Sequence, residues 1–563
     1  MKYSISLPLA RVLSSREIGE DKVESFLNPS LEHLNSPYLF ADMEKAVGRI
    51  KRAIDDGEAI MIHGDYDVDG VSALALLYRN LERLGAGKII PYIPDRFNEG
   101  YGLSEKGVRE AIEKGVGLII TVDCGVTAVD EIKLAREAGI DVIVTDHHEA
   151  QKVLPPAFAL INPKVGDYPF RELAGVGVAY KLMEALYEKL KLDKKPLYWD
   201  LDLVALGTVA DVVPLVDENR VLVKFGLIVL NDTLKAGLKA LKATAHLNGE
   251  IFPWHISFII APRLNAAGRL SHAEKAFRLL VTKSGEEALA IARELEDENR
   301  KRQNIEKQIL EEAREMAEKL DLDENWVLVL GKRDWHEGVI GIVASKLTEM
   351  YHRPTLLISL GEDMGKGSAR SIPSFHLYNA LKEAEDILIG FGGHKYAAGF
   401  RIGIDRIGAL REVMNNVAKR ELNEEDLIPE IYIDSKIEIS EITGEFLKDY
   451  EKLAPFGLGN PLPVFLLEEV EVVGEIEKVG DNHLRFTVRK GKDFLRVFAP
   501  GHAEFVNRLE RARASSTSCF SSSGTTARRG PNTSLKPWTS ESRDEGNQSR
   551  MLRLPRFHGE IHG

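Results

Sequence analysis

The chain has 563 residues, of which 44% are hydrophobic and 29% are charged, and its formal net charge is -13. This length is too great for a single hydrophobic core and predicts three or four domains of about 100–200 residues each. Taken alone, the acidic charge argues against a nucleic-acid partner, but net charge governs solubility and steering, and a local basic groove can still bind phosphates.

The sequence also bears on the compartment. No apolar segment approaches the roughly 18 residues that a membrane-spanning helix needs, so we expect no membrane association. The N-terminus lacks the apolar core of a secretory signal. Cys124 and Cys519 are too few for a disulfide framework, which fits a reducing compartment. We therefore expect a cytoplasmic protein.

After an N-terminal segment of residues 1–40, predicted strands and helices alternate. Nearly continuous apolar strands with crossover helices are typical of a parallel sheet that is covered on both faces. Ligands of such sheets bind at the carboxyl ends of the strands. The predicted strands lie near 59–63, 88–93, 117–123 and 140–146, and the predicted helices near 41–55, 72–85, 104–115 and 127–138.

Carboxylate and imidazole groups follow three of these strands. They are His63, Asp65, Asp67 and Asp69 after the first strand, Asp123 after the third, and Asp146, His147 and His148 after the fourth. A single Asp after a strand usually caps the next helix. Their joint occurrence at three strand ends indicates a metal site instead, because unpaired buried charge is strongly disfavoured.

The types of these side chains indicate which metals bind and what they do. Carboxylate oxygens suit Mg²⁺ and Mn²⁺, and imidazole suits Mn²⁺ better than Mg²⁺. Two such cations about 4 Å apart can clamp a phosphoryl group, activate a water and stabilise the leaving oxygen. We therefore expect two divalent cations, Mn²⁺ or Mg²⁺, and the hydrolysis of a phosphoester.

The rest of the chain predicts further domains. The first domain extends over 41–284; its part from 170 to 240 is helical, and an apolar helix at 201–210 ends directly before Asp211. A highly charged stretch at 285–325 predicts a solvated helix that joins two domains. A smaller α/β domain at 326–425 follows, with a strand at 354–360. Strands near 431–438, 464–478, 483–489 and 493–498 predict a small β-barrel within 426–510.

The composition changes near residue 511. Residues 511–563 carry nine Arg and Lys residues against four Asp and Glu residues, and no apolar periodicity continues. One interpretation is a basic, disordered tail that binds nucleic acid. The other, which we favour, is that out-of-frame or foreign residues replace the last strands, because the change comes before a barrel could close. The barrel is then incomplete.

These motifs resemble the DHH phosphoesterase superfamily, which is named after a motif such as Asp146-His147-His148. His63-x-x-x-Asp67-x-Asp69 and Asp123 before Cys-Gly are similar to its other motifs. Residues 392–399, Gly-Gly-His-Lys-Tyr-Ala-Ala-Gly, resemble the signature of a DHHA1 substrate-binding domain. The stretches 26–29, 261–269, 335–341 and 453–460 resemble one branch, the bacterial RecJ exonucleases. The resemblance covers residues 1 to about 505 and ends before the tail.

The resemblance implies an α/β fold: a parallel-sheet DHH domain, a smaller α/β DHHA1 domain joined to it by a long helix, and an OB-fold barrel. It also implies roles for single residues. The first metal would be held by His63, Asp67 and Asp123. The second would be held by Asp69, Asp123, His147 and Asp211, with Asp123 as the bridge. His148 would face the scissile phosphate as a catalytic residue, with Asp123 and Asp65, while Asp65 and Asp146 would orient the ligands.

The resemblance also implies where the substrate binds. The pocket for the 5′ end of the strand would combine residues of two domains. From the first domain come Arg96, Arg263 and Asn265, and from the second come Ser368, Arg370, Gly392, Gly393 and His394. In the third domain Phe486, Phe494 and Phe498 alternate with basic residues, which suits a barrel that stacks unpaired bases.

The implied activity is that of a metal-dependent 5′-to-3′ exonuclease that hydrolyses single-stranded DNA to 5′-mononucleotides in recombination and repair. We expect a monomer whose first two domains leave a channel too narrow for a duplex. Single-strand-binding protein and a RecQ-type helicase are the implied protein partners.

Three alternatives stay open. One is a nanoRNase or cyclic-dinucleotide phosphodiesterase of the same superfamily, against which the segment from 431 onward argues. Another is a family II pyrophosphatase, whose chain is much shorter. The third is a non-catalytic single-strand-binding scaffold, which lost metal ligands would mark; none is missing here.

Overall fold

The computed structural model describes residues 5–96, 98–511, 516–521, 536–539 and 552–553. The chain forms two units. The first comprises Met1–Asn299 with Glu441–Leu462, and the second comprises Arg300–Ser440 with Pro463–Gly563. Among the helices of the described residues, none combines the length and the apolar composition that crossing a membrane requires.

The first unit is built on a parallel sheet, as predicted. Its strand order is β2-β1-β3-β4-β5, and every neighbouring pair is parallel. The carboxyl ends of these strands therefore meet at one edge. The short strand β5 was not predicted. The strands are β1 (Ala59–His63), β2 (Lys88–Tyr92), β3 (Val116–Val122), β4 (Asp141–Thr145) and β5 (Ala159–Ile161).

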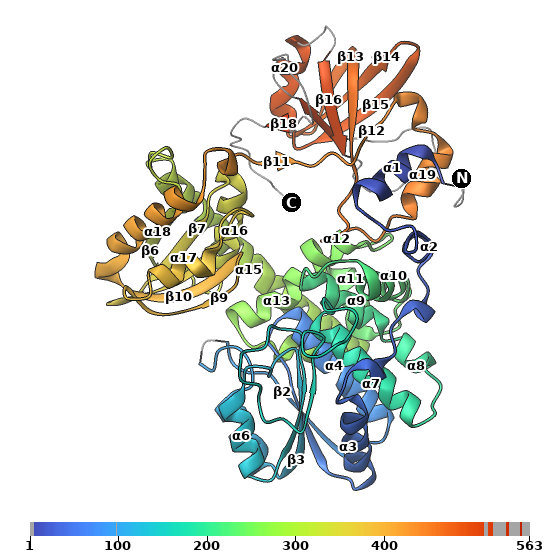
Figure 1. The fold of residues 1–563 in the computed structure, drawn as a ribbon, viewed down its shortest axis with the longest axis vertical. Helices are drawn as coiled ribbons and strands as arrows, with labels where there is room; N and C mark the ends of the chain where they lie inside the picture. The colour runs from blue at the N-terminus through green and yellow to red at the C-terminus, as the bar shows by residue number, and fades with distance from the viewer. Residues whose placement is uncertain (1–4, 97, 512–515, 522–535, 540–551, 554–563) are drawn as a thin grey trace. The chain divides into compact units, whose positions relative to one another are not determined.

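Helices cover both faces of this sheet (Figure 1). On one face α3 (Met43–Asp55), α4 (Val68–Arg83) and α7 (Gly175–Lys189) contribute to a large apolar core. On the other face α5 (Glu105–Glu113) and α6 (Val129–Glu137) build a smaller core. Helix α4 begins before the predicted residue 72, because the Asp67 carboxylate caps it and accepts the Gly70 N–H at 3.1 Å.

The other elements of this unit are helical. They are α1 (Leu7–Ser15), α2 (Val23–Leu27), short turns at Leu31–His33 and Pro37–Leu39, α8 (Lys195–Tyr198), α9 (Leu201–Ala210), α10 (Asp217–Asn231), α11 (Ala236–Thr244), α12 (Pro253–His255), a π-helical turn at Ile256–Ile260, α13 (Ala261–Leu270), α14 (Glu274–Val281), a turn at Ile439–Glu441 that enters the unit, and α19 (Gly444–Glu451). Helix α9 has the predicted bounds, and Asp211 follows it directly.

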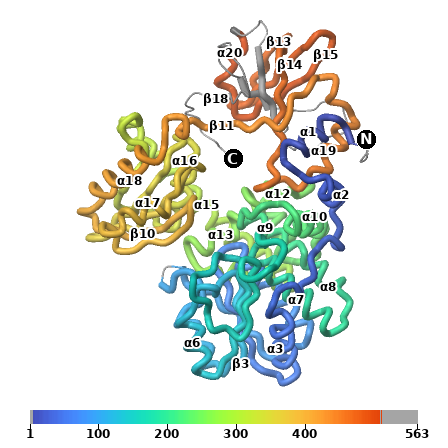
Figure 2. The backbone as a smooth tube through the Cα atoms, in the orientation of Figure 1, coloured from blue at the N-terminus to red at the C-terminus, as the bar shows by residue number. Residues whose placement is uncertain are grey.

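Residues 441–462, which the sequence analysis placed in the third domain, pack with the first unit. Their helix α19 lies beside α1 (Figure 2). The buried guanidinium of Arg220 on α10 holds them in place. It donates to the carbonyls of Lys452 at 2.9 Å and Leu453 at 2.8 Å, and also to the carbonyl of Phe26 at 2.9 Å.

The long charged helix α15 (Gly285–Ala317) contains the boundary between the units. The second unit then has a five-stranded sheet in the order β6-β7-β8-β10-β9, in which only β6 and β7 are parallel. The elements are β6 (Leu328–Arg333), α16 (Ile340–Tyr351), β7 (Thr355–Leu360), β8 (Met364–Arg370), α17 (Leu377–Glu383), β9 (Leu388–Gly393), β10 (Ala397–Gly403), a turn at Ile404–Arg406, α18 (Ile407–Glu421) and a turn at Glu425–Leu427.

A second sheet of this unit, in the order β15-β14-β13-β16-β17 with β12 beside β13, forms half of a barrel. The predicted strand at 431–438 is divided into β11 and β12. Most of the predicted tail lies outside the described residues, so its origin stays a prediction. The elements are β11 (Glu430–Ile431), β12 (Ser435–Lys436), β13 (Val464–Val479), β14 (His483–Lys490), β15 (Asp493–Pro500), a turn at Ala503–Phe505, α20 (Val506–Arg511), β16 (Ser516–Ser521), β17 (Lys536–Thr539) and β18 (Leu552–Arg553).

Candidate active site and metal centre

The loop after β1 and the first turn of α4 carry three carboxylates to the edge of the sheet. Asp67 caps α4, while Asp65 and Asp69 are buried. The Asp69 carboxylate accepts the N–H groups of Gly175 at 2.7 Å and Val176 at 3.0 Å, the first residues of α7. Unpaired N–H groups at a helix N-terminus stabilise negative charge. Helix α7 therefore fixes the position of Asp69.

Asp123 follows β3 in a left-handed backbone conformation, with φ at +61°. Asp is among the few residues other than Gly that adopt this conformation. Its carboxylate packs against Gly175, where a Cβ atom would lie only 2.5 Å from Asp123 Oδ1. The glycine at the start of α7 therefore makes room for Asp123.

The loop after β4 is held by Asp146. Its carboxylate accepts the backbone N–H groups of Val126, His147 and His148, and it lies 2.8 Å from His148 Nδ1. The Tyr101 hydroxyl donates to the Asp123 carbonyl at 3.0 Å and lies 2.8 Å from the same nitrogen. Although burial opposes it, the contact with Asp146 raises the pKa of His148. This geometry supports the orienting role proposed for Asp146.

The side chains from these separate loops converge. Their ligand atoms lie within 4.8 Å of one another in three groups. Asp123 belongs to two of the groups, which suits a bridging ligand, and Asp211 joins from the end of α9. The groups are Asp65, Asp67 and Asp123; Asp69, His147 and Asp211; and Asp123, His147 and His148.

Among the described residues, His63 belongs to none of these groups. Its ring stacks on Tyr92 at 4.9 Å between centroids, and its Nδ1 lies 3.9 Å from the Cys124 thiol sulfur. Burial lowers the pKa of His63 to about 4. Asp65 stands with Asp67 and Asp123 where the sequence analysis placed His63, and the role of His63 as a ligand stays a prediction.

The electrostatics of the site suit divalent cations. Burial, together with the neighbouring carboxylates, raises the pKa values of Asp65, Asp69 and Asp123 well above their ordinary range. Burial also raises the pKa of Asp211 to about 7. Nearby cations would stabilise the ionised carboxylates and reverse these shifts.

Buried atoms without a hydrogen-bond partner also indicate that the site binds divalent cations. Among the described residues, Asp65 Oδ1, Asp123 Oδ1, His147 Nε2 and His63 Nε2 are buried and have no hydrogen-bond partner. His147 Nε2 lies 3.1 Å from Asp123 Oδ1, but the contact lacks the geometry of a hydrogen bond. Burial lowers the pKa of His147 to about 3, so its ring is the neutral form that binds metals. These atoms fit Mn²⁺ or Mg²⁺ as ligands.

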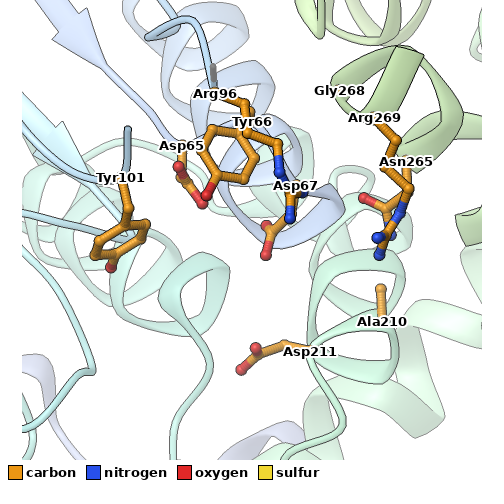
Figure 3. A pocket seen from close by; sticks show the side chains of 10 residues that line it. All are labelled: Asp65, Tyr66, Asp67, Arg96, Tyr101, Ala210, Asp211, Asn265, Gly268 and Arg269. Carbon is orange, nitrogen blue, oxygen red and sulfur yellow. The ribbon is translucent and has the colours of Figure 1, made fainter. Parts of the chain in front are cut away.

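A cavity of about 330 Å³ opens beside Asp65, Asp67 and Asp211 (Figure 3). This volume is at the small end of the range for ligand sites, about 300–1,000 Å³. Basic and amide groups face the carboxylates across it. The Arg96 guanidinium lies 4.9 Å from the centre of the Tyr66 ring. The lining residues are Asp65, Tyr66, Asp67, Arg96, Tyr101, Ala210, Asp211, Asn265, Gly268 and Arg269.

Five lining residues were not predicted as site residues: Tyr66, Tyr101, Ala210, Gly268 and Arg269. Arg269 ends the stretch 261–269, which was singled out as a whole. Tyr101 lies between Gly100 and Gly102, both with positive φ, and this pair of glycines was the only local signal. By contrast, the predicted Arg263 is paired with Glu296, Nε to Oε2 at 2.6 Å. It does not line the cavity, and its contact with substrate stays a prediction.

The predicted substrate residues of the second unit lie on adjacent strands. In the ladder β8-β10-β9, Ser368 pairs with Gly399, which pairs with Gly392. Arg370 donates to Ser368 Oγ at 3.2 Å. A Cβ atom at Gly341, in the first turn of α16, would lie 2.9 Å from the same Oγ. The sheet thus brings Arg370 and Ser368 to the N-terminus of a helix, which favours anions.

The predicted glycine turn ends β9. Gly393 has φ at +148°, and a Cβ atom there would lie 2.5 Å from the Ala397 carbonyl oxygen, so the turn requires glycine. The His394 N–H donates to that carbonyl at 2.8 Å. In the third domain, Phe486 is buried and Phe494 is exposed, so one of the predicted aromatic side chains faces solvent.

Comparison with known proteins gives the family. Residues 59–208 match the N-terminal domain of the DHH family, residues 324–420 the DHHA1 domain, and residues 433–518 the RecJ OB domain. The single-stranded-DNA-specific exonuclease RecJ of Haemophilus influenzae is 36% identical over 476 residues, 81% of this chain and 82% of that protein. The chain belongs to the RecJ family. The predicted fold, with DHH, DHHA1 and OB domains, is thereby confirmed.

The chain is also similar to other RecJ proteins, in sequence and in structure. The RecJ of Bacillus subtilis is 43% identical over 84% of this chain, and the match spans 60% of that relative, less than two thirds of its length. A crystal structure of RecJ with Mn²⁺ from Thermus thermophilus matches with a TM-score of 0.82 at 32% identity, over 97% of this chain and 78% of that one. A Mg²⁺ complex from the same organism matches with a TM-score of 0.75 at 30% identity, over 96% and 75% of the chains.

Proposed function

We propose that the protein is a metal-dependent exonuclease that degrades single-stranded DNA from its 5′ end to 5′-mononucleotides, in DNA recombination and repair. The observation that carries this proposal is the set of buried, unpaired atoms on Asp65, Asp123 and His147 beside a cavity with basic groups. The names of the RecJ relatives support the substrate, and the match to the RecJ OB domain favours this activity over that of a nanoRNase or cyclic-dinucleotide phosphodiesterase.

Most of the residues in this cluster would bind the two cations. Asp65, Asp67 and Asp123 would hold one divalent cation, with His63 as a further predicted ligand. Asp69, His147 and Asp211 would hold the second, with Asp123 shared. The cations, when bound, would supply Lewis-acid stabilisation of the charge that develops on the phosphate.

His148 lies beside this cluster, 4.0 Å from Asp123 Oδ1. Asp146 and Tyr101 both contact its Nδ1, so they fix the direction in which the ring presents its other nitrogen. The raised pKa of His148 favours the form with a proton on each nitrogen. We assign His148 the role of donating a hydrogen bond to the reacting phosphate.

The basic groups of the cavity would bind the terminal nucleotide. Arg96 and Arg269 can pair with phosphate oxygens, and Arg is well suited to bidentate contacts with them. Asn265 accepts the Val68 N–H at 3.1 Å and so ties α13 to the start of α4. In the second unit, Ser368 and Arg370 remain the proposed ligands of the 5′ phosphate, together with Gly392, Gly393 and His394.

The test is the digestion of single-stranded oligonucleotides labelled at either end, with Mn²⁺, with Mg²⁺ and with EDTA. We expect metal-dependent release of mononucleotides from the 5′ end, and loss of activity in Asp123→Ala. Blunt duplex should resist. An intact strand that still binds the protein would contradict the proposal and indicate a binding protein.

We further propose that the protein acts as a monomer in the cytoplasm and works with single-strand-binding protein and a RecQ-type helicase. The family resemblance supports these partners, and the buried free thiol of Cys124 is compatible with a reducing compartment. Light scattering of the purified protein and pull-down with each partner would test these points.

A further inference from the structure

An apolar groove of about 150 Å³ lies next to the proposed active site, within the first unit. One segment serves both hollows, because Val209 and Val212 line the groove while Ala210 and Asp211 between them line the cavity. No charged side chain is among its lining residues. These are Val209, Val212, Val213, Leu215, Pro253, Trp254, Ser257, Phe258, Phe456, Gly457 and Leu458.

Large apolar side chains of the groove are unusually exposed. Phe258 keeps 76% of its surface accessible, Val212 60%, Leu458 55% and Trp254 45%. Phe258 lies in the π-helical turn between α12 and α13, whose end residues Ile256 and Ile260 are buried. Single-turn π-helices are frequent at functional sites. Clustered exposed apolar groups mark surfaces that bind a partner or a ligand.

Ring stacking and backbone hydrogen bonds hold the lining of the groove in place. The Trp254 indole stacks on His255 with 3.6 Å between ring centroids, and His255 Nδ1 accepts the Phe252 N–H at 2.9 Å. Elsewhere in the lining, the Leu215 N–H donates to the Leu458 carbonyl at 2.7 Å. Groups held in place in the free protein lose little entropy when they bind a ligand.

We propose that this groove stacks unpaired bases of the DNA strand on the 3′ side of the scissile bond. The inference rests on the proposed exonuclease function. If the terminal nucleotide occupies the cavity beside Asp211, the next nucleotides leave past Val212 and reach Trp254 and Phe258. The lining offers aromatic faces to bases and no cation to phosphates, which suits sequence-independent stacking. Bases stacked and paired within a duplex could not enter it.

The variants for the test are Trp254→Ala, Phe258→Ala and their combination. Trp199→Ala is the matched control. Trp199 is 55% exposed, compared with 45% for Trp254, and it does not line the groove. Binding of a dye-labelled single strand is measured by fluorescence anisotropy without metal, so that no cleavage occurs. We expect each groove variant to bind about tenfold more weakly. The control should change binding by less than about twofold.

A second arm changes the DNA instead of the protein. Removing the bases near the 5′ end, beyond the terminal nucleotide, should weaken binding to the unchanged protein, but should add little to the loss in the double variant. Trp254→Phe should retain most of the affinity, because it keeps an aromatic face, and this variant separates stacking from a folding defect.

The outcomes separate this inference from the proposed function. If the protein does not cleave DNA, yet groove variants bind single strands more weakly, the exonuclease proposal fails and the base-stacking groove stands. If the protein cleaves from the 5′ end and the groove variants bind and cleave normally, the groove proposal is overturned. It is equally overturned if the variants change only self-association in sedimentation velocity, since the groove would then be a contact between copies of the chain.

Discussion

The replacement Gly175→Ala tests whether the site depends on the close contact between α7 and Asp123. A Cβ atom at residue 175 would lie 2.5 Å from Asp123 Oδ1, 2.6 Å from its Cβ and 2.7 Å from its Cγ. All three distances are too short for non-bonded atoms, so the carboxylate or the helix must move. The same residue donates its N–H to Asp69 at 2.7 Å, so a movement of the helix would displace a second ligand.

The expected magnitude follows from this geometry. Relieving the contact requires a shift approaching 1 Å, and a misplacement of about 1 Å can cost about 10²-fold in rate. Overpacking of this kind costs about 1–3 kcal/mol of stability, which a folded domain of this size tolerates. We therefore expect a folded protein whose kcat is about 100-fold lower.

The assay is steady-state release of mononucleotides from a single-stranded oligonucleotide at saturating Mn²⁺, with binding of Mn²⁺ measured by calorimetry. Gly177→Ala is the control: it lies two residues further along the same helix, and the nearest atom to its new Cβ is Leu173 Cδ2 at 3.3 Å. It should retain most of the activity. Equal activity and metal affinity in Gly175→Ala and Gly177→Ala would refute the reasoning.

Three further predictions concern pH, the cavity and the anchor of α10. Because burial raises the pKa of Asp211 to about 7, protons compete with the metal, and the affinity for Mn²⁺ should fall from about pH 8 to pH 6; a flat calorimetric profile would contradict this. Arg269→Ala should raise the KM for single-stranded DNA about tenfold, and an unchanged KM would count against the cavity assignment. Arg220→Met removes the donor that the Phe26 and Lys452 carbonyls share, while Leu453 keeps the Asn460 amide; it should cost about 2–5 kcal/mol in urea unfolding, and a loss below about 1 kcal/mol would contradict it.

The convergence of the site could be predicted from the sequence because parallel strands end at one edge. The predicted strand ends before Asp123 and Asp146 place both residues in loops at that edge, as the structure has them. The predicted apolar helix before Asp211 has the same bounds as α9. The start of α4 was placed too late, because residues 68–71 read as part of a loop until Asp67 is known to cap the helix.

The remaining differences depend on the direction of side chains, which spacing does not reveal. The His63 ring stacks on Tyr92, and its Nε2 is buried without a hydrogen-bond partner among the described residues, so its role as a metal ligand stays a prediction. Asp65, two residues later, lies with Asp67 and Asp123, a position that spacing alone did not give it. Likewise, Arg263 and Arg269 belong to one helix, but they are not on the same side of it, and only Arg269 reaches the cavity.

The buried Arg220 has a consequence for synthesis on the ribosome. Its guanidinium needs carbonyls that are made more than two hundred residues later, at Lys452 and Leu453. Until those residues have been made, the Phe26 carbonyl is the partner already available to this arginine. Every residue of the first unit precedes position 463, so the residues after 511 are made when that unit already has all of its parts.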